Sequence, residues 1–377
     1  MMFSQKVRSS ISAFVLSLTS SLCTALPFSA AAQEKPEVKI GAILPMTGVL
    51  ASVGEAMQRG LTMAASDTKH ITTRIIIEDD QTANRVRTVN AANKLVGVDK
   101  VNIVFNAYAS TTSAFSSVLK TSNVPCLVLW DSNRALSKLG EQIFGFGYEN
   151  ELAGEDMASF ARDHLRHRTV GIISFHDEWS ELITRAFEER FKALGGTVVL
   201  HEQVNADTTD FRTILARLKS SNAGAVYLPL YGLGLQSAIK QARNIKFEGD
   251  LLTADSFVDS DIAATKGAAE GMYLTQIWLD DAAFTWKYEA AFGNAKTSGT
   301  NLGYTALAYD AVMLVDAAAA QITQGGEKIT TTSLLARLPN FSFDGVLGAT
   351  KVSRDRTVER REKVLQVKND SYTEVIR

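Results

Sequence analysis

The feature that most constrains the fold is an alternation of strand and helix patterns, which runs along the chain twice. The first run opens with residues 38–44, whose apolar side chains are typical of a buried strand. A helix is predicted from about residue 54, with Met57, Leu61 and Ala64 on one face. Further strand patterns, separated by helical stripes, lie at residues 74–78, 101–105 and 124–130. Such an alternation predicts a parallel sheet with helices on both faces.

The second run of the same alternation begins after about residue 150. Residues 304–320 are apolar on nearly all sides, which predicts a buried helix rather than a surface one. The chain has only 6 prolines and no low-complexity segment, so short crossover strands are expected between the two runs instead of a flexible linker. The predicted fold class is α/β, with two doubly wound parallel-sheet lobes. The strand patterns of the second run lie at residues 169–175, 197–201, 225–230, 251–254 and 272–277.

The first 32 residues predict a cleaved signal peptide. Lys6 and Arg8 form a positive region, residues 11–22 form a short apolar region, and Ala30 and Ala32 provide the small residues of a cleavage site. The apolar region is shorter than the roughly 20 residues that a membrane-spanning helix needs. We therefore expect cleavage after Ala32 and a periplasmic protein.

The net charge and the two cysteines limit which partners and covalent links the chain can have. Loss of the signal peptide takes the formal net charge from −2 to −4, which is too mild for a nucleic-acid partner. Cys23 leaves with the signal peptide, and its neighbour Leu22 does not fit a lipid-attachment signal. Cys126 then stands alone inside an apolar strand, where a buried side chain is expected. We expect no internal disulfide, no metal site and no cofactor.

Polar residues at the strand ends are the candidates for binding, because ligands of open α/β sheets bind beyond the carboxyl ends of the strands. Ser110 and Thr111 lie between a strand and a helix, where hydroxyls and free backbone N–H groups suit a carboxylate. An ordinary helix cap fits the same residues. Asp255 ends a strand of the second run and could pair with a ligand ammonium or cap the next turn. Tyr231 could close over a ligand or pack on the lobe surface.

Signatures of catalysis are weak. The sequence contains no G-x-S-x-G nucleophile elbow and no phosphate-binding loop. His176, Asp177 and Glu178 lie at a strand end where acid–base chemistry is conceivable, but no nucleophile or metal ligand accompanies them. A place on a pocket rim or in a helix cap fits His176 or Asp177 better. We expect no catalytic residues and a protein that is not an enzyme.

Longer motifs, taken in order and spacing, carry a family resemblance. The chain resembles the type I periplasmic solute-binding proteins of the leucine/isoleucine/valine-binding branch, which serve ABC importers. The resemblance covers essentially the whole chain after the signal peptide, and it depends on the order of the motifs because none is specific alone. The motifs are KIGAILPMTGVLASVGEAMQRGL (39–61), IIIEDDQTANRVRTVNAANKLV (75–96), NAYASTTSA (106–114), ISFHDEWS (173–180), TDFRTILARLK (209–219), AEGMYLT (269–275) and YTALAYDAV (304–312).

The resemblance implies a ligand site of eight residues. The hydroxyl loop that holds a ligand carboxylate corresponds to Ala109, Ser110 and Thr111, with Ala109 where the family commonly has serine. The next loop, which supplies a carbonyl and a threonine in the family, corresponds to Trp130, Asp131 and Ser132. The family's second-lobe aromatic residue falls on Tyr231, and its acidic partner for an ammonium falls on Asp255. Trp130 and Asp131 depart from the family pattern, which puts a branched-chain ligand in doubt and favours a larger or flatter one.

The resemblance also implies how the chain works. Lobe one would comprise residues 37–148 and 280–345, and lobe two residues 149–279 and 346–377, joined by a three-strand hinge. A monomer would close its lobes on a small solute and present it to an inner-membrane ABC permease. An amino acid is the first choice of solute, followed by a carboxylate without an amine, such as an aromatic acid, or an amide. A periplasmic protein that presents its ligand to a membrane receptor or kinase is the alternative role.

Overall fold

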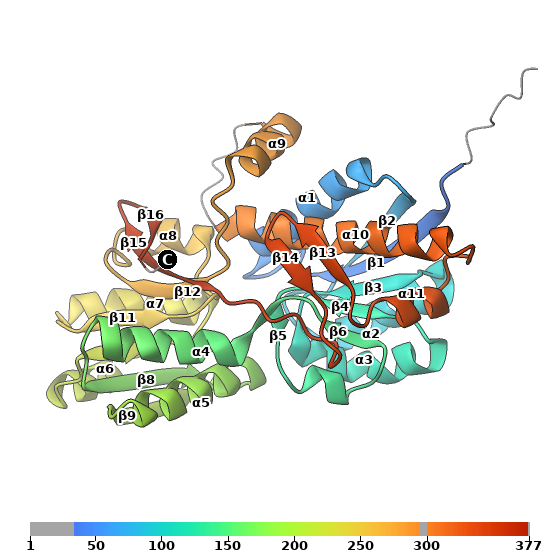
Figure 1. Ribbon diagram of the computed structural model, residues 1–377. Coiled ribbons are helices and arrows are strands. Elements are labelled where there is room, and N and C mark those ends of the chain that lie inside the picture. The colour runs from blue at the N-terminus through green and yellow to red at the C-terminus, as the bar shows by residue number, and fades with distance from the viewer. Residues whose placement is uncertain (1–33, 294–299, 376–377) are drawn as a thin grey trace, which may run out of the picture. The chain divides into compact units, whose positions relative to one another are not determined.

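The computed structural model describes residues 34–293 and 300–375, which are arranged around two separate sheets. In Figure 1 the blue and cyan elements belong to the first sheet and its helices, and the green and yellow elements belong to the second. We refer to each sheet, together with all segments of the chain that pack on it, as lobe one and lobe two, so segments from the end of the chain belong to both. The predicted fold class is confirmed, although the sheet of lobe two ends in two antiparallel strands. The predicted signal peptide, its cleavage site and Cys23 lie outside the described residues.

The sheet of lobe one is parallel and five-stranded, in the order β2-β1-β3-β4-β6. Side chains on both faces of β1 are buried, as is usual for a parallel sheet that helices cover on both sides. Cys126 on β4 is a buried free cysteine, as predicted, and burial raises the pKa of its thiol. The strands are β1 (Glu37–Leu44), β2 (Thr72–Asp79), β3 (Ile103–Asn106), β4 (Cys126–Val128) and β6 (Ile143–Gly145).

Helix α10 (Thr300–Gln324) is the central helix of lobe one. It is apolar and long enough to cross a membrane, but 83% of its most apolar window is buried inside the protein. Tyr304, Leu307 and Val315 lie fully buried in the core, so α10 is the buried helix that the sequence predicted. The other helices and strands of lobe one are α1 (Ala51–Asp67), α2 (Arg85–Lys94), η1 (Leu95–Asp99), α3 (Ala109–Ser122), η2 (Leu136–Lys138), α9 (Ala282–Phe292), α11 (Thr331–Arg337), β13 (Ser342–Gly345) and β14 (Gly348–Lys351).

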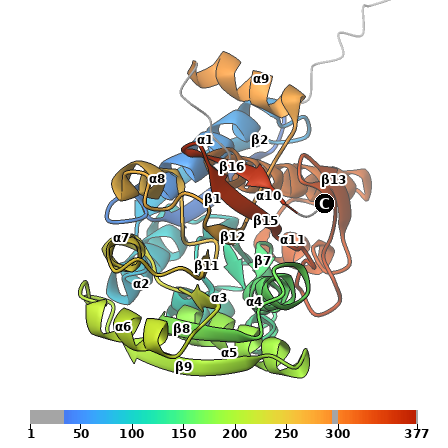
Figure 2. The ribbon, with the colours of Figure 1, turned by 90° about the vertical axis from the view of Figure 1, so that its left-hand side faces the viewer.

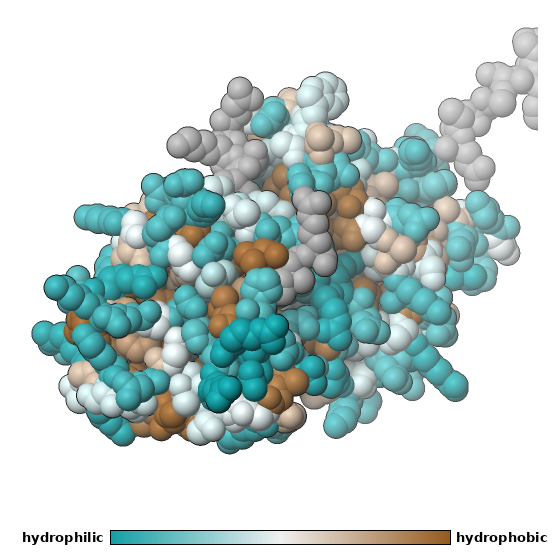
Figure 3. Space-filling view, turned by 60° about the vertical axis from the view of Figure 1, so that its left-hand side comes forward, coloured by the Kyte–Doolittle hydropathy of each residue, from teal (hydrophilic) through white to brown (hydrophobic). Residues whose placement is uncertain are grey.

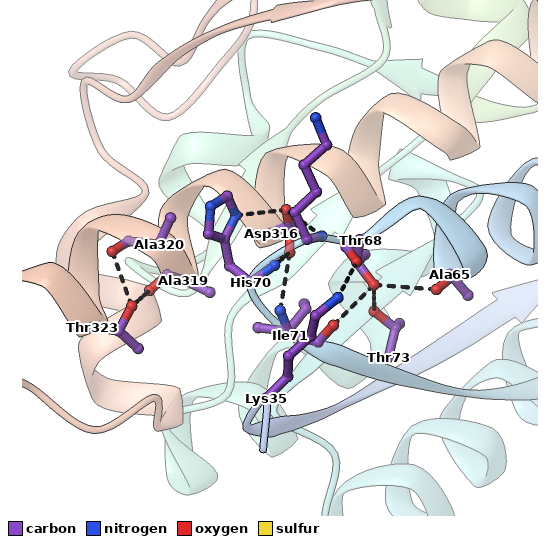
Figure 4. A network of polar contacts seen from close by, with 11 residues as sticks. Lys35, Ala65, Thr68, His70, Ile71, Thr73, Asp316, Ala319, Ala320 and Thr323 are labelled. Carbon is purple, nitrogen blue, oxygen red and sulfur yellow. Dashed lines mark hydrogen bonds and ion pairs between the residues drawn. The ribbon is translucent and has the colours of Figure 1, made fainter. Parts of the chain in front are cut away.

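A buried carboxylate fastens α10 to the first part of the chain (Figure 4). Asp316 accepts hydrogen bonds from the backbone N–H groups of Lys69, His70 and Ile71 at 3.2, 2.8 and 3.1 Å. The ring nitrogen Nδ1 of His70 lies 2.9 Å from the same carboxylate. These contacts satisfy the backbone of the turn between α1 and β2 from a residue far along the sequence. Lobe one is therefore built from two distant segments of chain.

The sheet of lobe two has seven strands in the order β16-β15-β12-β11-β10-β8-β9. Alternate residues of β8 serve its two faces: Ile172 packs in the core with Phe187 of α5, and Ile173 in the core with Phe211. Figure 2 shows α4, α5, α6, α7 and α8 around these strands. The strands are β8 (Thr169–Phe175), β9 (Thr197–Val204), β10 (Ala225–Tyr227), β11 (Asp250–Thr253), β12 (Tyr273–Gln276), β15 (Lys363–Lys368) and β16 (Ser371–Glu374). The helices are α4 (Asn150–Ser159), η3 (Phe160–His164), α5 (Glu178–Ala193), α6 (Arg212–Ser220), α7 (Gly232–Asn244) and α8 (Asp259–Thr265).

The chain passes between the lobes three times. The first passage follows the short pairing of β5 (Asp131–Ser132) with β7 (Tyr148–Glu149), and the second lies between β12 and α9. The third comes later than the boundary at residue 346 that the family resemblance implied. Val352 and Val358 pack in the core of lobe one, and the Val358 N–H donates to the Gly145 carbonyl at 2.9 Å. The last passage therefore lies near residue 361, just before β15.

Apolar side chains gather inside the lobes rather than on the surface. The face drawn in Figure 3 is mostly hydrophilic, with apolar atoms in small groups. Among the residues that the structure describes, the large apolar side chains with high exposure are Val49, Val86, Val98, Leu233 and Trp286.

Candidate functional site

A cavity of about 290 Å³ lies between the two lobes, and residues of both line it. Every lining segment follows the carboxyl end of a parallel strand, which is where α/β folds place their ligands. Lobe one contributes Leu50, Thr82, Ala83, Arg85, Tyr108, Ser110, Thr111 and Trp130, and lobe two contributes Asp177, Glu178, Trp179, Tyr231, Asp255 and Ser256.

The first turn of α3 forms part of the lobe-one wall. Its N-cap residue, Tyr108, provides no side-chain cap, so Ser110 and Thr111 lie inside the first turn rather than capping it. Among the described hydrogen bonds, none uses the backbone N–H of Ser110 or Thr111. The first N–H groups of a helix have no partner within it and carry a partial positive charge. This end of α3 can therefore hold an anion.

A buried amide, Asn106 at the end of β3, organises this turn. Its Nδ2 lies 2.7 Å from the Tyr108 carbonyl and 3.1 and 2.8 Å from the hydroxyls of Thr111 and Thr112. The Thr112 hydroxyl also donates to the Tyr108 carbonyl at 2.7 Å. The two threonine hydroxyls are thus turned toward the interior, which leaves the Ser110 hydroxyl and the backbone N–H groups to face the cavity.

Arg85, the first residue of α2, brings a positive charge to the same wall. Its guanidinium donates to the Ser110 carbonyl and to the Ser113 hydroxyl, both at 3.0 Å. The side chain is exposed, so solvent weakens its field at the cavity. Arg85 and the end of α3 together make this side of the cavity electropositive.

Trp130 lies at the back of lobe one, in the loop that follows β4. Its ring centroid is 5.6 Å from that of Tyr108 and 4.9 Å from that of Tyr304, the latter in an edge-to-face arrangement. The carbonyl of Trp130 accepts from the Tyr148 N–H at 3.1 Å. A Cβ added at Gly147 would lie 1.9 Å from that carbonyl oxygen, so only glycine fits there. The indole is therefore fixed by lobe one.

Asp255 faces Trp130 from lobe two. Its Oδ2 accepts the indole N–H of Trp130 at 2.8 Å, and its carbonyl accepts from Gln276 Nε2 at 2.9 Å and from the Tyr304 hydroxyl at 3.0 Å. Asp255 is only 3% exposed. Burial raises the pKa of its carboxyl to about 6, and the hydrogen bond from Trp130 acts in the opposite direction. The donors to Asp255 are thus all neutral, and two of them, the indole of Trp130 on the carboxylate and the hydroxyl of Tyr304 on the carbonyl, come from lobe one.

The rest of the lobe-two wall is aromatic and acidic. Tyr231 packs edge-on against Phe175 and Trp179, with ring centroids 4.9 and 6.2 Å apart. Burial, followed by the nearby charge of Asp177, raises the pKa of the Tyr231 hydroxyl. Asp177 caps α5 by accepting from the Ser180 N–H at 2.9 Å. With Tyr108 and Trp130 opposite, these side chains give the cavity aromatic surfaces on both sides.

Five of the eight predicted site residues line this cavity: Ser110, Thr111, Trp130, Tyr231 and Asp255. Ala109 does not line it, because it is buried as the first residue of α3. Ser132 does not line it either, since it is fully buried in β5 on the path between the lobes. Asp131 precedes it in β5, and its side chain lies outside the description. Asp255 does not cap the following helix, because Val258 holds that position in α8.

Several lining residues were not singled out from the sequence, and Arg85 and Trp179 are the most important of them. Trp179 lies four residues after the strand end at Phe175, so it would have been a candidate if more residues after that strand had been included. Arg85 begins a helix and gives no such signal, because its place in the cavity depends on how α2 packs. A pocket rim or a helix cap was expected for His176 or Asp177. Asp177 has both positions, while His176 is exposed and pairs with Glu181 at 2.7 Å.

A comparison with known protein families shows which family the chain belongs to. The sequence model of a family described as periplasmic binding protein matches residues 37–371. The chain belongs to this family. The match begins with the first residue of β1 and ends at the first residue of β16, so both walls of the cavity lie inside it.

Individual relatives in the periplasmic binding protein family are distant in sequence. The Leu/Ile/Val-binding protein of Escherichia coli K12 is 22% identical over 263 residues, which cover 67% of this chain and 71% of that protein. A leucine-binding protein of Thermotoga maritima has a similar structure, with a TM-score of 0.81, 22% identity and coverage of 90% of this chain and 98% of that one.

A second solved structure is that of an ABC-transporter solute-binding protein of R. palustris in complex with benzoate. Its TM-score is 0.78 at 20% identity, with coverage of 90% of this chain and 95% of that one. At these identities the structures share the fold with this chain, and the leucine and benzoate in their names describe those proteins alone. The family resemblance found in the sequence is confirmed.

Proposed function

We propose that this chain is the extracytoplasmic solute-binding component of an ABC importer and that it captures an amino acid or a related small carboxylate or amide by closing its lobes. The observation that carries this proposal is the cavity between the lobes, whose lining comes from the strand ends of both sheets. A solute in that cavity would touch both walls at once. It would bind the closed arrangement better than an open one, and that difference drives closure.

The electropositive wall supports a carboxylate on the solute. The first turn of α3 offers the N–H groups of Ser110 and Thr111, and Arg85 adds a charge beside them. Two solute classes fit this anchor. An amino acid is favoured by the acids of the opposite wall, Asp177, Glu178 and Asp255, and an aromatic acid by the aromatic rings of both walls.

The role of the protein is proposed as binding without catalysis. The family consists of solute-binding proteins, and the lining residues include no nucleophile paired with a base in the described part of the chain. We further propose a periplasmic location, a monomer and an inner-membrane permease as partner. Presentation of the solute to a membrane receptor or kinase is the alternative, and neighbouring genes for a permease and ATPase or for a kinase separate the two.

A thermal-shift panel tests the proposal. The chain from Gln33 is stripped of bound solute by unfolding and refolding, then heated with amino acids, aromatic and aliphatic carboxylates, amides and sugars. A solute at 100 times its dissociation constant adds about 2.7 kcal/mol of stability. That is a shift of several degrees for a protein of this size. A selective shift with one class supports the proposal, and a flat panel across all classes counts against it.

A pair of variants then locates the solute. Ser110→Glu places a negative charge beside the N–H groups in the cavity and should weaken binding of a carboxylate at least 10-fold. Ser117→Glu is the matched control, because Ser117 is exposed on the same helix α3 and does not line the cavity. Equal binding by both variants would mean that the carboxylate does not sit at the end of α3.

A further inference from the structure

Trp130 and Asp255 meet across the cavity from opposite lobes. The indole N–H donates to Asp255 Oδ2 at 2.8 Å, and both side chains line the cavity. Asp255 is the acid that a solute ammonium would have to reach if the end of α3 held the carboxylate of an amino acid. In this chain the protein's own indole already occupies one oxygen of that acid.

The indole cannot easily move aside for an ammonium. Trp130 is 4% exposed and packs against Tyr108 and Tyr304, so rotating its ring would disrupt two aromatic contacts. A separation of 2.8 Å between the indole nitrogen and the carboxylate also leaves no room for a third group between them. Asp255 forms no ion pair with a lysine or arginine in the described residues. The neutral N–H therefore takes the place of a cation.

The other two acids of the cavity are poor substitutes. Both oxygens of Asp177 are engaged by Ser180, Oδ1 with its N–H at 2.9 Å and Oδ2 with its hydroxyl at 3.2 Å. Glu178 is exposed, so water screens its charge. Neither offers a buried carboxylate with a free oxygen opposite the end of α3.

The aromatic side chains suit a flat solute. Tyr108 and Trp130 lie in the lobe-one wall, and Trp179 and Tyr231 lie in the lobe-two wall. A planar ring between such walls gains offset or edge-to-face contacts in addition to the burial of its apolar surface. Its carboxylate would point to the N–H groups of Ser110 and Thr111.

We infer that the cavity selects a carboxylate with an aromatic body and no α-ammonium, and that the hydrogen bond from Trp130 to Asp255 sets this selection. The inference rests on the proposed function and specifies its solute class. Trp130 acts by engaging the acid that would otherwise attract the ammonium. Trp130 therefore distinguishes this cavity from an amino-acid site, although Asp255, the acid that would bind an ammonium, is present.

Matched solutes test the selection directly. The pairs are 3-phenylpropanoate with phenylalanine and 4-methylpentanoate with leucine, because the members of each pair differ only in the α-ammonium. Binding of each to the refolded chain from Gln33 is measured by calorimetry. We expect 3-phenylpropanoate to bind best and each amino acid to bind at least 10-fold more weakly than its partner.

The variant Trp130→Phe keeps an aromatic ring, removes the N–H donor and makes the ring smaller. It should free Asp255 for an ammonium and lower the ratio of the phenylalanine to the 3-phenylpropanoate dissociation constant by about 10-fold or more, the size of a hydrogen bond to a charged group. Trp286→Phe is the matched control, because Trp286 is 72% exposed on α9 and lies outside the cavity lining. It should leave the ratio unchanged.

The outcomes separate the inference from the proposed function. Amino acids that bind the wild-type chain as well as or better than their amine-free partners would overturn the inference and leave the binding function intact. The same holds if Trp130→Phe folds, binds 3-phenylpropanoate and keeps the wild-type ratio. If neither pair binds and the wider panel is also flat, the proposed function itself fails and the inference falls with it.

Discussion

The two walls of the cavity are made from the same structural parts but are held in place differently. Each wall consists of loops that follow parallel strands, yet the lobe-one wall is supported from within its own lobe. Asn106 ties the first turn of α3 together, and Tyr108 and Tyr304 hold Trp130. In lobe two, the side chain of Asp255 depends on Trp130, and its carbonyl depends partly on Tyr304.

This difference assigns the walls different parts in binding. In the proposed closure, the first turn of α3 and the ring of Trp130 are positioned by lobe-one contacts before the lobes meet, so lobe one is suited to receive the solute first. A wall whose key acid is satisfied by the opposite lobe is completed only when the lobes come together. Lobe two is therefore suited to close over a solute that is already docked.

The largest effect on the lobe-one wall is expected from a substitution of Gly147, whose backbone lies directly against the carbonyl of Trp130. A Cβ at this position would lie 1.9 Å from the Trp130 carbonyl oxygen and 2.5 Å from that of Leu129, and backbone atoms cannot yield cheaply. Gly147→Ala should cost more than about 3 kcal/mol of stability in urea unfolding, as severe overpacking does. Gly97→Ala is the control, since nothing lies within 4 Å of its added Cβ, and it should change stability by no more than about 1 kcal/mol. Similar losses for both would show that the contact with Trp130 does not constrain this loop.

The next largest effect is expected from Asp255 of lobe two, whose contribution to the stability of the fold depends on pH. Burial raises the pKa of Asp255 to about 6 from an ordinary value of 3.8, so the folded chain binds this proton more tightly than the unfolded chain does. Stability contributed by this group therefore falls as the pH rises from about 4 to about 6, and the full penalty is present above that range. Two pKa units correspond to about 3 kcal/mol. Burial and the charge of Asp255 also raise the pKa of Glu362, which adds a change in the same direction.

Asp255→Asn should thus stabilise the chain at pH 7.5 and give a much smaller gain at pH 4.5, because it removes the buried charge and keeps an oxygen for the indole. Thermal unfolding at the two pH values measures this. Asp210→Asn is the control: its hydrogen bonds with Arg212 lower the pKa of the Asp210 carboxyl to about 2, so its contribution is lost only below about pH 4. A gain from Asp255→Asn that is equal at both pH values would mean that another group carries the titration.

The contribution of Asn106 to the lobe-one wall is tested by comparing its substitution with that of Ser256 in lobe two. Asn106→Ala removes the amide that contacts the Tyr108 carbonyl and two threonine hydroxyls, and we expect a loss of about 2 kcal/mol. Carboxylate binding should weaken as well, because the first turn of α3 loses its organiser. In lobe two, Ser256→Ala removes one hydrogen bond, from its hydroxyl to the Leu230 carbonyl at 2.6 Å, and should cost about 1 kcal/mol. If Ser256→Ala weakened binding more than Asn106→Ala, lobe one would not be the better organised wall.

The sequence predicted the architecture well because it depends on patterns that repeat over many residues. The strands, the buried helix α10 and the position of Ser110, Thr111, Tyr231 and Asp255 at strand ends all follow from local periodicity. The contact between Trp130 and Asp255 could not be predicted, because it joins loops 125 residues apart in the sequence.

The boundary at residue 346 was misplaced for a related reason. The sequence pattern of the hairpin β13–β14 and of the segment after it does not show which lobe they belong to. Only their packing assigns them to lobe one. Ser132 was expected at the ligand because the family resemblance aligns it with a binding threonine, but it pairs with β7 in the passage between the lobes.

The smallest expected effects come from the exposed charges at the edges of the two walls, and they should have opposite signs. Arg85→Gln removes a cation beside the end of α3, so a carboxylate such as 3-phenylpropanoate should bind about 2- to 5-fold more weakly. Glu178→Gln removes an anion from the lobe-two side and should strengthen binding by a similar factor. Both changes should shrink as salt is raised from 0.01 to 1 M, because the screening length falls from about 30 to about 3 Å. Changes of the same sign, or changes that persist in high salt, would show that these side chains touch the solute directly. The unequal charge of the two walls would then reflect contact rather than the field across the cavity.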